Sequence, residues 1–435
     1  MIVNLRKKAA TTNILRSFTI FMMLSFFFFP SITLAQTYVE LTPEISVSEL
    51  YDDNLYLDDK DEISDYITEV SPGFTLNILS EKYNLGFIYV PTIVRYVHED
   101  QANTVRHLGT ITYEQYLHEH LKFDLTNTYL KSEEPLEEEY ATEVRHTRNT
   151  YQRNTGSASL SYLFGTENEL TAGYRNEFLK NKDETIDDGM TQHPFALITH
   201  WFDMRNGLEL NYEYTKAHFW RDDEFEAGDD YTGNSYGLRY IYRFTPHATV
   251  SLDYNLTTRN FRGNDTDEDY KIHDTGIEFE KAFSSDFSIT LGGGYFIREN
   301  DYSDNENGYM YHASLTKEFE RGGFSLGGNG GWDESYLTAD RTGFTRYWSL
   351  ETSVDYRFLE RLEGYAGSSY RHDKDEEDLK WDTLAGNCGL RWSFMRWFSL
   401  SLDYTYTKRD DDVDTDDYTD NQIMLILTAS RLYRW

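Results

Sequence analysis

Acidic residues dominate the side chains of this chain that could do chemistry, with 75 Asp and Glu against 41 Lys and Arg. They gather in runs such as DDNLYLDDKDE after Tyr51 and DDDVDTDD from Asp410. Clustered carboxylate oxygens could bind divalent cations loosely. The segment from Asp301 to Gly308 is similar to a calcium loop, but Ser303 stands at its expected first ligand position. We therefore predict no metal site.

Motifs for catalysis are not expected in this chain. The sequence has no H-E-x-x-H pair, and we expect no nucleophile elbow of the G-x-S-x-G type. His118 and His120 flank a predicted turn, and we interpret them as solvated turn residues rather than ligands. We therefore predict that the protein is not an enzyme and has no cofactor.

Charged residues also recur at every second position within apolar stretches. In residues 248–257, for example, Asp253 lies between Leu252 and Tyr254. Successive side chains of a strand point to opposite faces, so such charges share one face. They could pair across neighbouring strands and fix the register, or they could select ions or sugars. The candidate residues of this polar face are Arg175, Glu177, Arg239, Arg243, Asp253, Glu278, Glu280, Asp355, Arg357, Arg391 and Asp403.

The stretches that carry these charges are predicted strands. Residues 398–407 read FSLSLDYTYT, and the chain ends on YTDNQIMLILTASRLYRW from Tyr418. Apolar residues at period two do not form a stripe on a helix, so long helices are disfavoured. We expect the last strand to run to Trp435, although Arg431 stands where the alternation requires an apolar residue.

Short turns alternate strictly with longer acidic loops along the chain, and this repeat predicts the fold. Aromatic residues precede the short turns at intervals of 36 to 42 residues. Each interval holds two strands, whereas a propeller blade of similar length holds four. The fold class predicted is all-β, a transmembrane antiparallel up-and-down barrel of about 20 strands, with 18 also possible. The aromatic residues before the turns are Phe164, Phe202, Phe244, Phe283, Phe319, Phe358 and Phe394, and the chain ends on Trp435.

Such a barrel would place its apolar face against lipid, because unpaired polar groups in hydrocarbon cost several kcal/mol each. The polar face would then line the lumen, which in a barrel of about 20 strands is too wide for side chains alone to fill. We expect the short turns in the periplasm and the acidic loops outside the cell. An even number of strands would leave both termini in the periplasm.

The amino terminus is typical of a secretory signal peptide. Its basic residues come before an apolar run from Phe18 to Ala35. They are Arg6, Lys7, Lys8 and Arg16. We predict a signal peptide over residues 1–35 and a barrel domain over residues 36–435, in the outer membrane of a Gram-negative cell. The partners expected are outer-membrane lipid and the barrel-assembly machinery.

The charge balance excludes some functions. Residues 1–35 hold four of the 41 basic residues and no acidic ones, so the rest of the chain has a net charge of about −38. Such a chain has no basic surface for nucleic acid. The single Cys388 excludes an internal disulfide framework.

The segment from Tyr51 to Ile78 resembles the start of a family of outer-membrane β-barrel porins. Its matching features are Tyr51-Asp52-x-Asn54, an acidic loop, Asp65 and Ser71-Pro72-Gly73. The resemblance implies a link to exopolysaccharide or capsule production, with a role in moving polymer across the outer membrane. It implies no catalytic or binding residues.

Three functions remain open from the sequence. The first is a passive channel for exopolysaccharide export, with polysaccharide as a partner. The second is a general diffusion porin for small solutes, which a loop folded into the lumen would favour. The third is a surface barrel that does not transport. The sequence leaves the oligomeric state open.

Overall fold

The computed structural model describes residues 37–134, 146–183, 188–220, 230–262, 269–335, 343–376, 378–413 and 415–435. The predicted signal peptide lies outside the described residues, as does most of the acidic run from Glu133. No helix in these ranges is long and apolar enough to cross a membrane.

A short 3-10 helix, η1 (Asp100–Ala102), follows the third strand. The strands are β1 (Tyr38–Asp52), β2 (Asp65–Leu79), β3 (Tyr83–Tyr96), β4 (Thr104–His118), β5 (Leu121–Ser132), β6 (Tyr151–Leu163), β7 (Glu169–Asn181), β8 (Asp188–Trp201), β9 (Asn206–Trp220), β10 (Tyr231–Thr245), β11 (Ala248–Phe261), β12 (Tyr270–Ser284), β13 (Phe287–Asn300), β14 (Glu306–Phe319), β15 (Gly322–Ser335), β16 (Gly343–Leu359), β17 (Leu362–Lys374), β18 (Lys380–Met395), β19 (Phe398–Asp411), β20 (Tyr418–Ser430) and β21 (Tyr433–Arg434).

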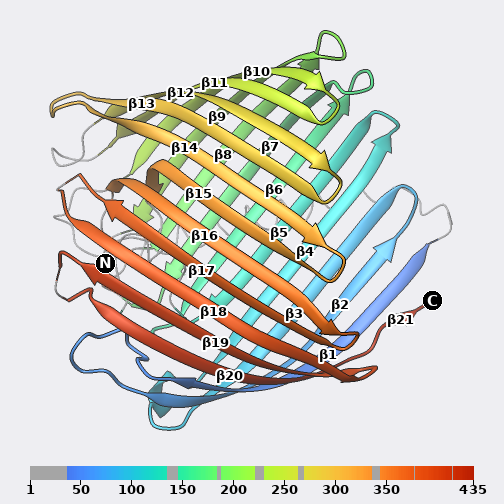
Figure 1. Ribbon diagram of the computed structural model, residues 1–435, viewed down its shortest axis with the longest axis vertical. Coiled ribbons are helices and arrows are strands. Elements are labelled where there is room, and N and C mark those ends of the chain that lie inside the picture. The colour runs from blue at the N-terminus through green and yellow to red at the C-terminus, as the bar shows by residue number, and fades with distance from the viewer. Residues whose placement is uncertain are drawn as a thin grey trace, which may run out of the picture.

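The strands form one closed antiparallel sheet (Figure 1). From β1 to β20 each strand pairs with the next in sequence, and β20 pairs with β1, where Ser48 lies opposite Ile426. Closure leaves no free edge among the twenty long strands of the described ranges. The prediction of an up-and-down barrel of about 20 strands is therefore confirmed, and the propeller is excluded.

The last strand ends earlier than the sequence predicted. β20 stops at Ser430, and pairing with β1 resumes at β21, where Tyr433 lies opposite Leu41. In this register Arg431 falls opposite Pro43, which has no N–H to donate to the ladder. The Arg431 N–H still donates to the Pro43 carbonyl at 3.3 Å, and its guanidinium lies over the rings of Trp397 and Tyr433. The expectation of one strand running to the end was wrong for this reason.

One face of the sheet is an exposed apolar belt. The twenty long strands are 12 to 17 residues long, more than the 9 to 11 or so that a tilted strand needs to cross a bilayer core. Their central apolar side chains are exposed and stand at every second position of each strand, so they all point to the same face, as a lipid-facing surface requires. They include Leu210, Leu238, Leu252, Ile277, Leu291, Leu350, Leu402 and Leu425.

The short turns and both ends of the sheet lie together at one end of the barrel, here called the turn end. The Val39 N–H donates to the Trp435 carbonyl at 2.9 Å, and the Trp435 N–H donates to the Val39 carbonyl at 3.1 Å. The predicted aromatic residues at this end include the exposed Phe202, Phe244, Phe283, Phe319, Phe358 and Trp435. The opposite end, here called the loop end, carries the longer acidic connections. Which end faces the periplasm stays a prediction.

Candidate functional site

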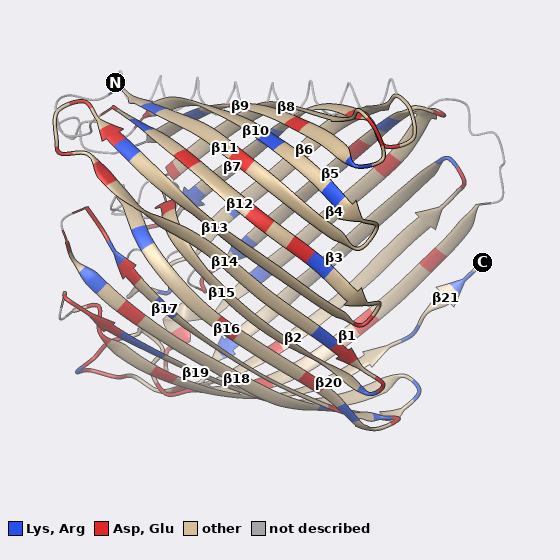
Figure 2. Cartoon of the chain, turned by 45° about the horizontal axis from the view of Figure 1, so that its top comes forward, with Lys and Arg blue, Asp and Glu red and all other residues tan. Residues whose placement is uncertain are grey.

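The eleven predicted lining residues all lie on the face opposite the apolar belt. On β10, for example, Arg239 lies between the exposed Leu238 and Tyr240, so its side chain points the other way. Figure 2 shows that both signs of charge recur along the strands. The polar face therefore carries opposite charges close enough to interact.

Arg239 is the centre of a charge network on three neighbouring strands. Its Nη2 donates to Glu278 on β12 at 2.6 Å and to Ser251 on β11 at 2.8 Å. Its Nε lies 3.2 Å from Asp253, also on β11. Register accounts for this arrangement, because Arg239 lies opposite Asp253 and Ser251 lies opposite Glu278.

Other predicted lining arginines have acidic partners as well. Arg175 on β7 pairs with Glu213 on β9, and Arg243 lies 3.1 Å from Glu167. The Arg243 guanidinium also lies 3.9 Å from the ring centroid of Trp201, a cation–π contact. The predicted Glu177 is itself paired with Arg153 on β6.

The remaining predicted residues lie nearer the turn end. A pocket there is lined by Asp355, Arg357 and Arg391, among others. Arg357 also lies 3.3 Å from Glu363, and Asp403 accepts a hydrogen bond from Tyr365. The last residue, Glu280 on β12, lies between Thr249 and Thr290 in the register and completes the predicted set.

A serine motif that the sequence prediction missed has no catalytic setting. Residues Gly323–Gly327 do match G-x-S-x-G, so the expectation that the pattern would be missing was wrong. A nucleophile elbow needs a sharp turn between a strand and a helix. These residues instead lie within β15, where the Ser325 hydroxyl is 2.7 Å from the hydroxyl of Ser353 on β16.

At the loop end, one segment crosses part of the mouth of the barrel. Residues 146–150, here called the crossing segment, lead into β6. The Arg148 Nε donates to the Leu55 carbonyl at 2.8 Å, and its Nη2 lies 3.5 Å from Asp52. His146 donates from Nδ1 to the Tyr56 carbonyl at 3.0 Å. β6 and β1 are five positions apart around the sheet, so these contacts are made across the opening. Sequence reasoning did not find this segment.

The crossing segment also reaches the loop between β19 and β20. His146 Nε2 lies 3.9 Å from Asp416 Oδ1. The Asp416 carboxylate raises the pKa of His146, against the effect of burial. Burial alone would raise the pKa of Asp416, but hydrogen bonds from His146 and Thr415 and the nearby charges of Arg409 and His146 together lower that pKa. The two pKa shifts favour a charged pair.

Ion pairs between strands that are not neighbours narrow the mouth elsewhere. Arg259 on β11 lies 2.7 Å from Glu334 on β15, and Arg298 on β13 pairs with Glu376 in the loop after β17. A buried apolar cluster lies beside them, with Phe296 and Phe344 among its members. Side chains on one wall therefore contact residues several strands away.

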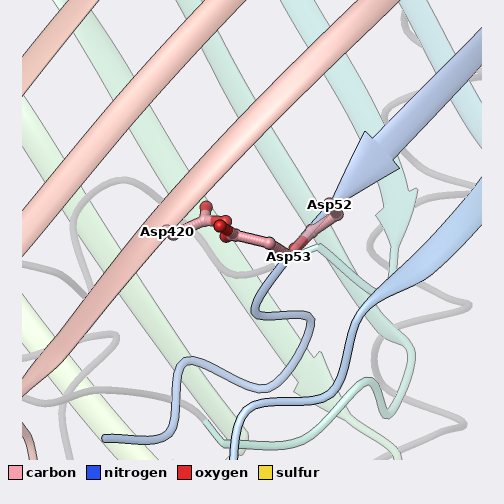
Figure 3. A group of neighbouring side chains, drawn as sticks. All are labelled: Asp52, Asp53 and Asp420. Atoms are coloured by element: carbon pink, nitrogen blue, oxygen red, sulfur yellow. The ribbon is translucent and has the colours of Figure 1, made fainter.

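Three aspartates at the same end could hold a metal ion. Figure 3 shows Asp420 on β20 facing Asp52, the last residue of β1, and Asp53, the next residue along the chain. One carboxylate oxygen from each residue lies within 4.8 Å of the others. Asp52 belongs to the motif noted in the sequence, but no metal site was expected, because Asp420 comes close to it only through barrel closure.

Comparison with known proteins identifies the family. Residues 209–431, just over half of the chain, match the model of a family described as "Putative beta-barrel porin 2". The chain belongs to this family. The predicted resemblance to a family of outer-membrane β-barrel porins is therefore confirmed. The matched residues do not include the segment from Tyr51 to Ile78, on which the prediction was based. No curated protein matches this porin.

Solved structures of outer-membrane proteins have a similar fold. The siderophore receptor PirA from Pseudomonas aeruginosa matches with a TM-score of 0.53 and 9% identity, over 90% of this chain and 80% of the receptor. The copper transporter OprC matches with a TM-score of 0.54 and 9% identity, over 90% and 80%. A variant of the ferric enterobactin receptor PfeA from P. aeruginosa gives 0.53 and 10%, over 91% and 80%. At these identities the likeness shows the barrel fold alone.

Proposed function

We propose that this porin is a passive channel for small hydrated solutes, with a preference for neutral and cationic ones. The crossing segment supports this proposal most directly. Across the mouth, Arg148 joins the segment before β6 to the connection between β1 and β2, and His146 joins it to the connection between β19 and β20. A loop folded into a porin opening limits the size of the solutes that pass.

The charges of the polar face support the preference for cations. Each of three lining arginines has an acidic partner, namely Arg175, Arg239 and Arg243. Arg239 has two, the carboxylates of Asp253 and Glu278. A paired guanidinium attracts anions less than a free one, whereas the excess acidic charge of the chain remains. A lining of this kind raises the local concentration of cations.

Exopolysaccharide export is the second candidate, and barrel width favours it. Barrels of 16 to 18 strands already leave an aqueous channel, and this barrel has twenty long strands in its described ranges. The family resemblance implies the same role. The contacts across the mouth count against it, because a sliding polymer needs an opening free of such a segment.

Conductance of the refolded chain in planar bilayers separates these functions. The small-solute channel would be supported by steady conductance steps that small poly(ethylene glycols) block and polysaccharide does not. Its reversal potential in a salt gradient should show a preference for cations over anions. Transient block by polysaccharide and not by small sugars would support export. A refolded barrel that never conducts would overturn both.

A further inference from the structure

The three aspartates at the loop end lie where the barrel closes. Asp52 is the last residue of β1, and Asp420 is near the start of β20. β1 and β20 pair directly, with Asp52 opposite Gln422. Asp53 follows in the connection to β2. The cluster therefore joins the first long strand of the chain to the last one.

Two of these carboxylates are removed from water. Asp52 is 1% exposed and Asp420 is 6% exposed. Within the described ranges, Oδ1 of Asp420 is buried and has no hydrogen-bond partner. A buried carboxylate oxygen without a donor loses its hydration without compensation. This oxygen belongs to a group that faces two further carboxylates.

The surrounding donors fix the carboxylates but do not balance their charge. Asn421 donates to Asp53 from its backbone N–H at 2.6 Å and from its side chain at 2.8 Å. Gln422 donates to Asp420 at 2.9 Å and to Asp52 at 3.3 Å. Arg148 lies 3.5 Å from Asp52. When all three aspartates are ionised, as ligands of a cation would be, three carboxylates and one guanidinium leave two negative charges.

We propose that Asp52, Asp53 and Asp420 bind a Ca²⁺ ion that fastens β1 to β20 at the mouth of the barrel. Ca²⁺ prefers oxygen ligands at about 2.3 to 2.6 Å, and two ligands of one such ion can be up to about 4.8 Å apart. The three carboxylates lie within that limit of 4.8 Å. A divalent ion also balances the two remaining charges, and the free oxygen of Asp420 becomes a ligand.

Calorimetric titration of the refolded mature chain with CaCl₂ tests this site. The chain is treated with a chelator, in detergent free of lipopolysaccharide and at physiological salt, so that lipid and loose binding to exposed acids do not contribute. We expect one saturable Ca²⁺ per chain and a higher unfolding temperature when it binds. Absence of saturable binding would overturn the site, and tighter binding of Mg²⁺ than of Ca²⁺ would overturn the choice of ion.

Asp420→Asn is the decisive variant, because it keeps the shape of the side chain and removes one charged ligand. Its Ca²⁺ affinity should fall about tenfold or more, and its unfolding temperature should no longer respond to Ca²⁺. Without Ca²⁺ it should be at least as stable as the wild type, since it removes repulsion from Asp52. Asp53→Asn, on a less buried residue, should also weaken binding. Asp59→Asn, in the exposed part of the same loop, is the matched control. Equal affinity in both site variants and the wild type would overturn the proposal.

Discussion

Replacing Arg148 with methionine should widen the channel by releasing the crossing segment. The Arg148 side chain is 6% exposed and lies 3.5 Å from Asp52, whose side chain is 1% exposed. It also donates to the Leu55 carbonyl at 2.8 Å. Methionine keeps much of the volume but removes the charge and every donor. Asp52 then loses its cationic partner, and the Leu55 carbonyl loses a hydrogen bond.

The size of the effect follows from burial. Breaking a buried ion pair by removing one partner costs about 3 to 5 kcal/mol, because the remaining charge is left uncompensated. The additional pair with Glu134, at 3.4 Å, adds little because that carboxylate is 39% exposed. At about 1.4 kcal/mol for each factor of ten, the ratio of seated to released crossing segment should fall about a hundredfold to a few thousandfold.

Single-channel recording in planar bilayers measures this release. With a chelator present, so that bound cations do not contribute, Arg148→Met should give larger conductance steps and admit larger poly(ethylene glycols) than the wild type. Lys60→Met is the control, because the Lys60 side chain is 74% exposed and lies 4.0 Å from Asp59. If Arg148→Met keeps the conductance and size limit of the wild type, the crossing segment does not set the opening and the reasoning fails.

Three further outcomes follow from the contacts described. The pKa of His146 is raised by Asp416, so its stabilising contact should be complete below about pH 6.5 and lost as the pH rises through the raised value. The protection of the crossing-segment amides against hydrogen exchange, relative to their intrinsic exchange rates, should fall there in the wild type but not in His146→Gln. Arg239→Gln should move the reversal potential further toward cations. Gly322→Ala should lower the free energy of unfolding in urea by about 1 to 3 kcal/mol, because a Cβ there would collide with the backbone carbonyl oxygen of Asp355. Gly293→Ala, with 4.0 Å of space, should change it far less.

The barrel itself could be predicted from the sequence because its physical cause is local. Lipid on one face and polar surroundings on the other impose a period of two on every strand. Residues 248–257 show this alternation, and β11 covers them. Turn positions such as Pro246-His247 interrupt the pattern, and the structure places a connection there. The fold class and the number of strands followed from these two signals.

The partners of the lining charges could not be predicted, because they depend on the register. The pairing of β10 with β11 shifts by one residue between Arg243 and Thr245, next to the turn. Without this shift, Arg239 would lie opposite Tyr254 instead of Asp253. Similar shifts occur beside other short turns, including that between Ala282 and Ser284. One extra residue of this kind leaves no clear sign in an alternating sequence.

The mouth depends on contacts between residues far apart in the chain. Arg148 meets Asp52 from 96 positions away, and Gln422 reaches the same residue from 370 positions away. No periodicity links such residues. The sequence marked Asp52 and Asn54 as part of a motif, but it gave no reason for the motif. The structure provides that reason through the position of both residues beside β20.

Barrel closure explains why polar contacts gather at this point. Among the long strands described, β1 and β20 are the one neighbouring pair that no connection joins directly, so no turn fixes their register. A slip by one residue would move each apolar side chain to the polar face. The backbone exchange between Val39 and Trp435 holds one end of the pair. At the other end, Asn54 donates to the Thr419 carbonyl at 2.9 Å and Asn421 donates to Asp53. These side-chain contacts take the place of a turn, and the acidic cluster lies among them. A cation bound there would therefore hold both the register of β1 against β20 and the contacts at the mouth of the barrel.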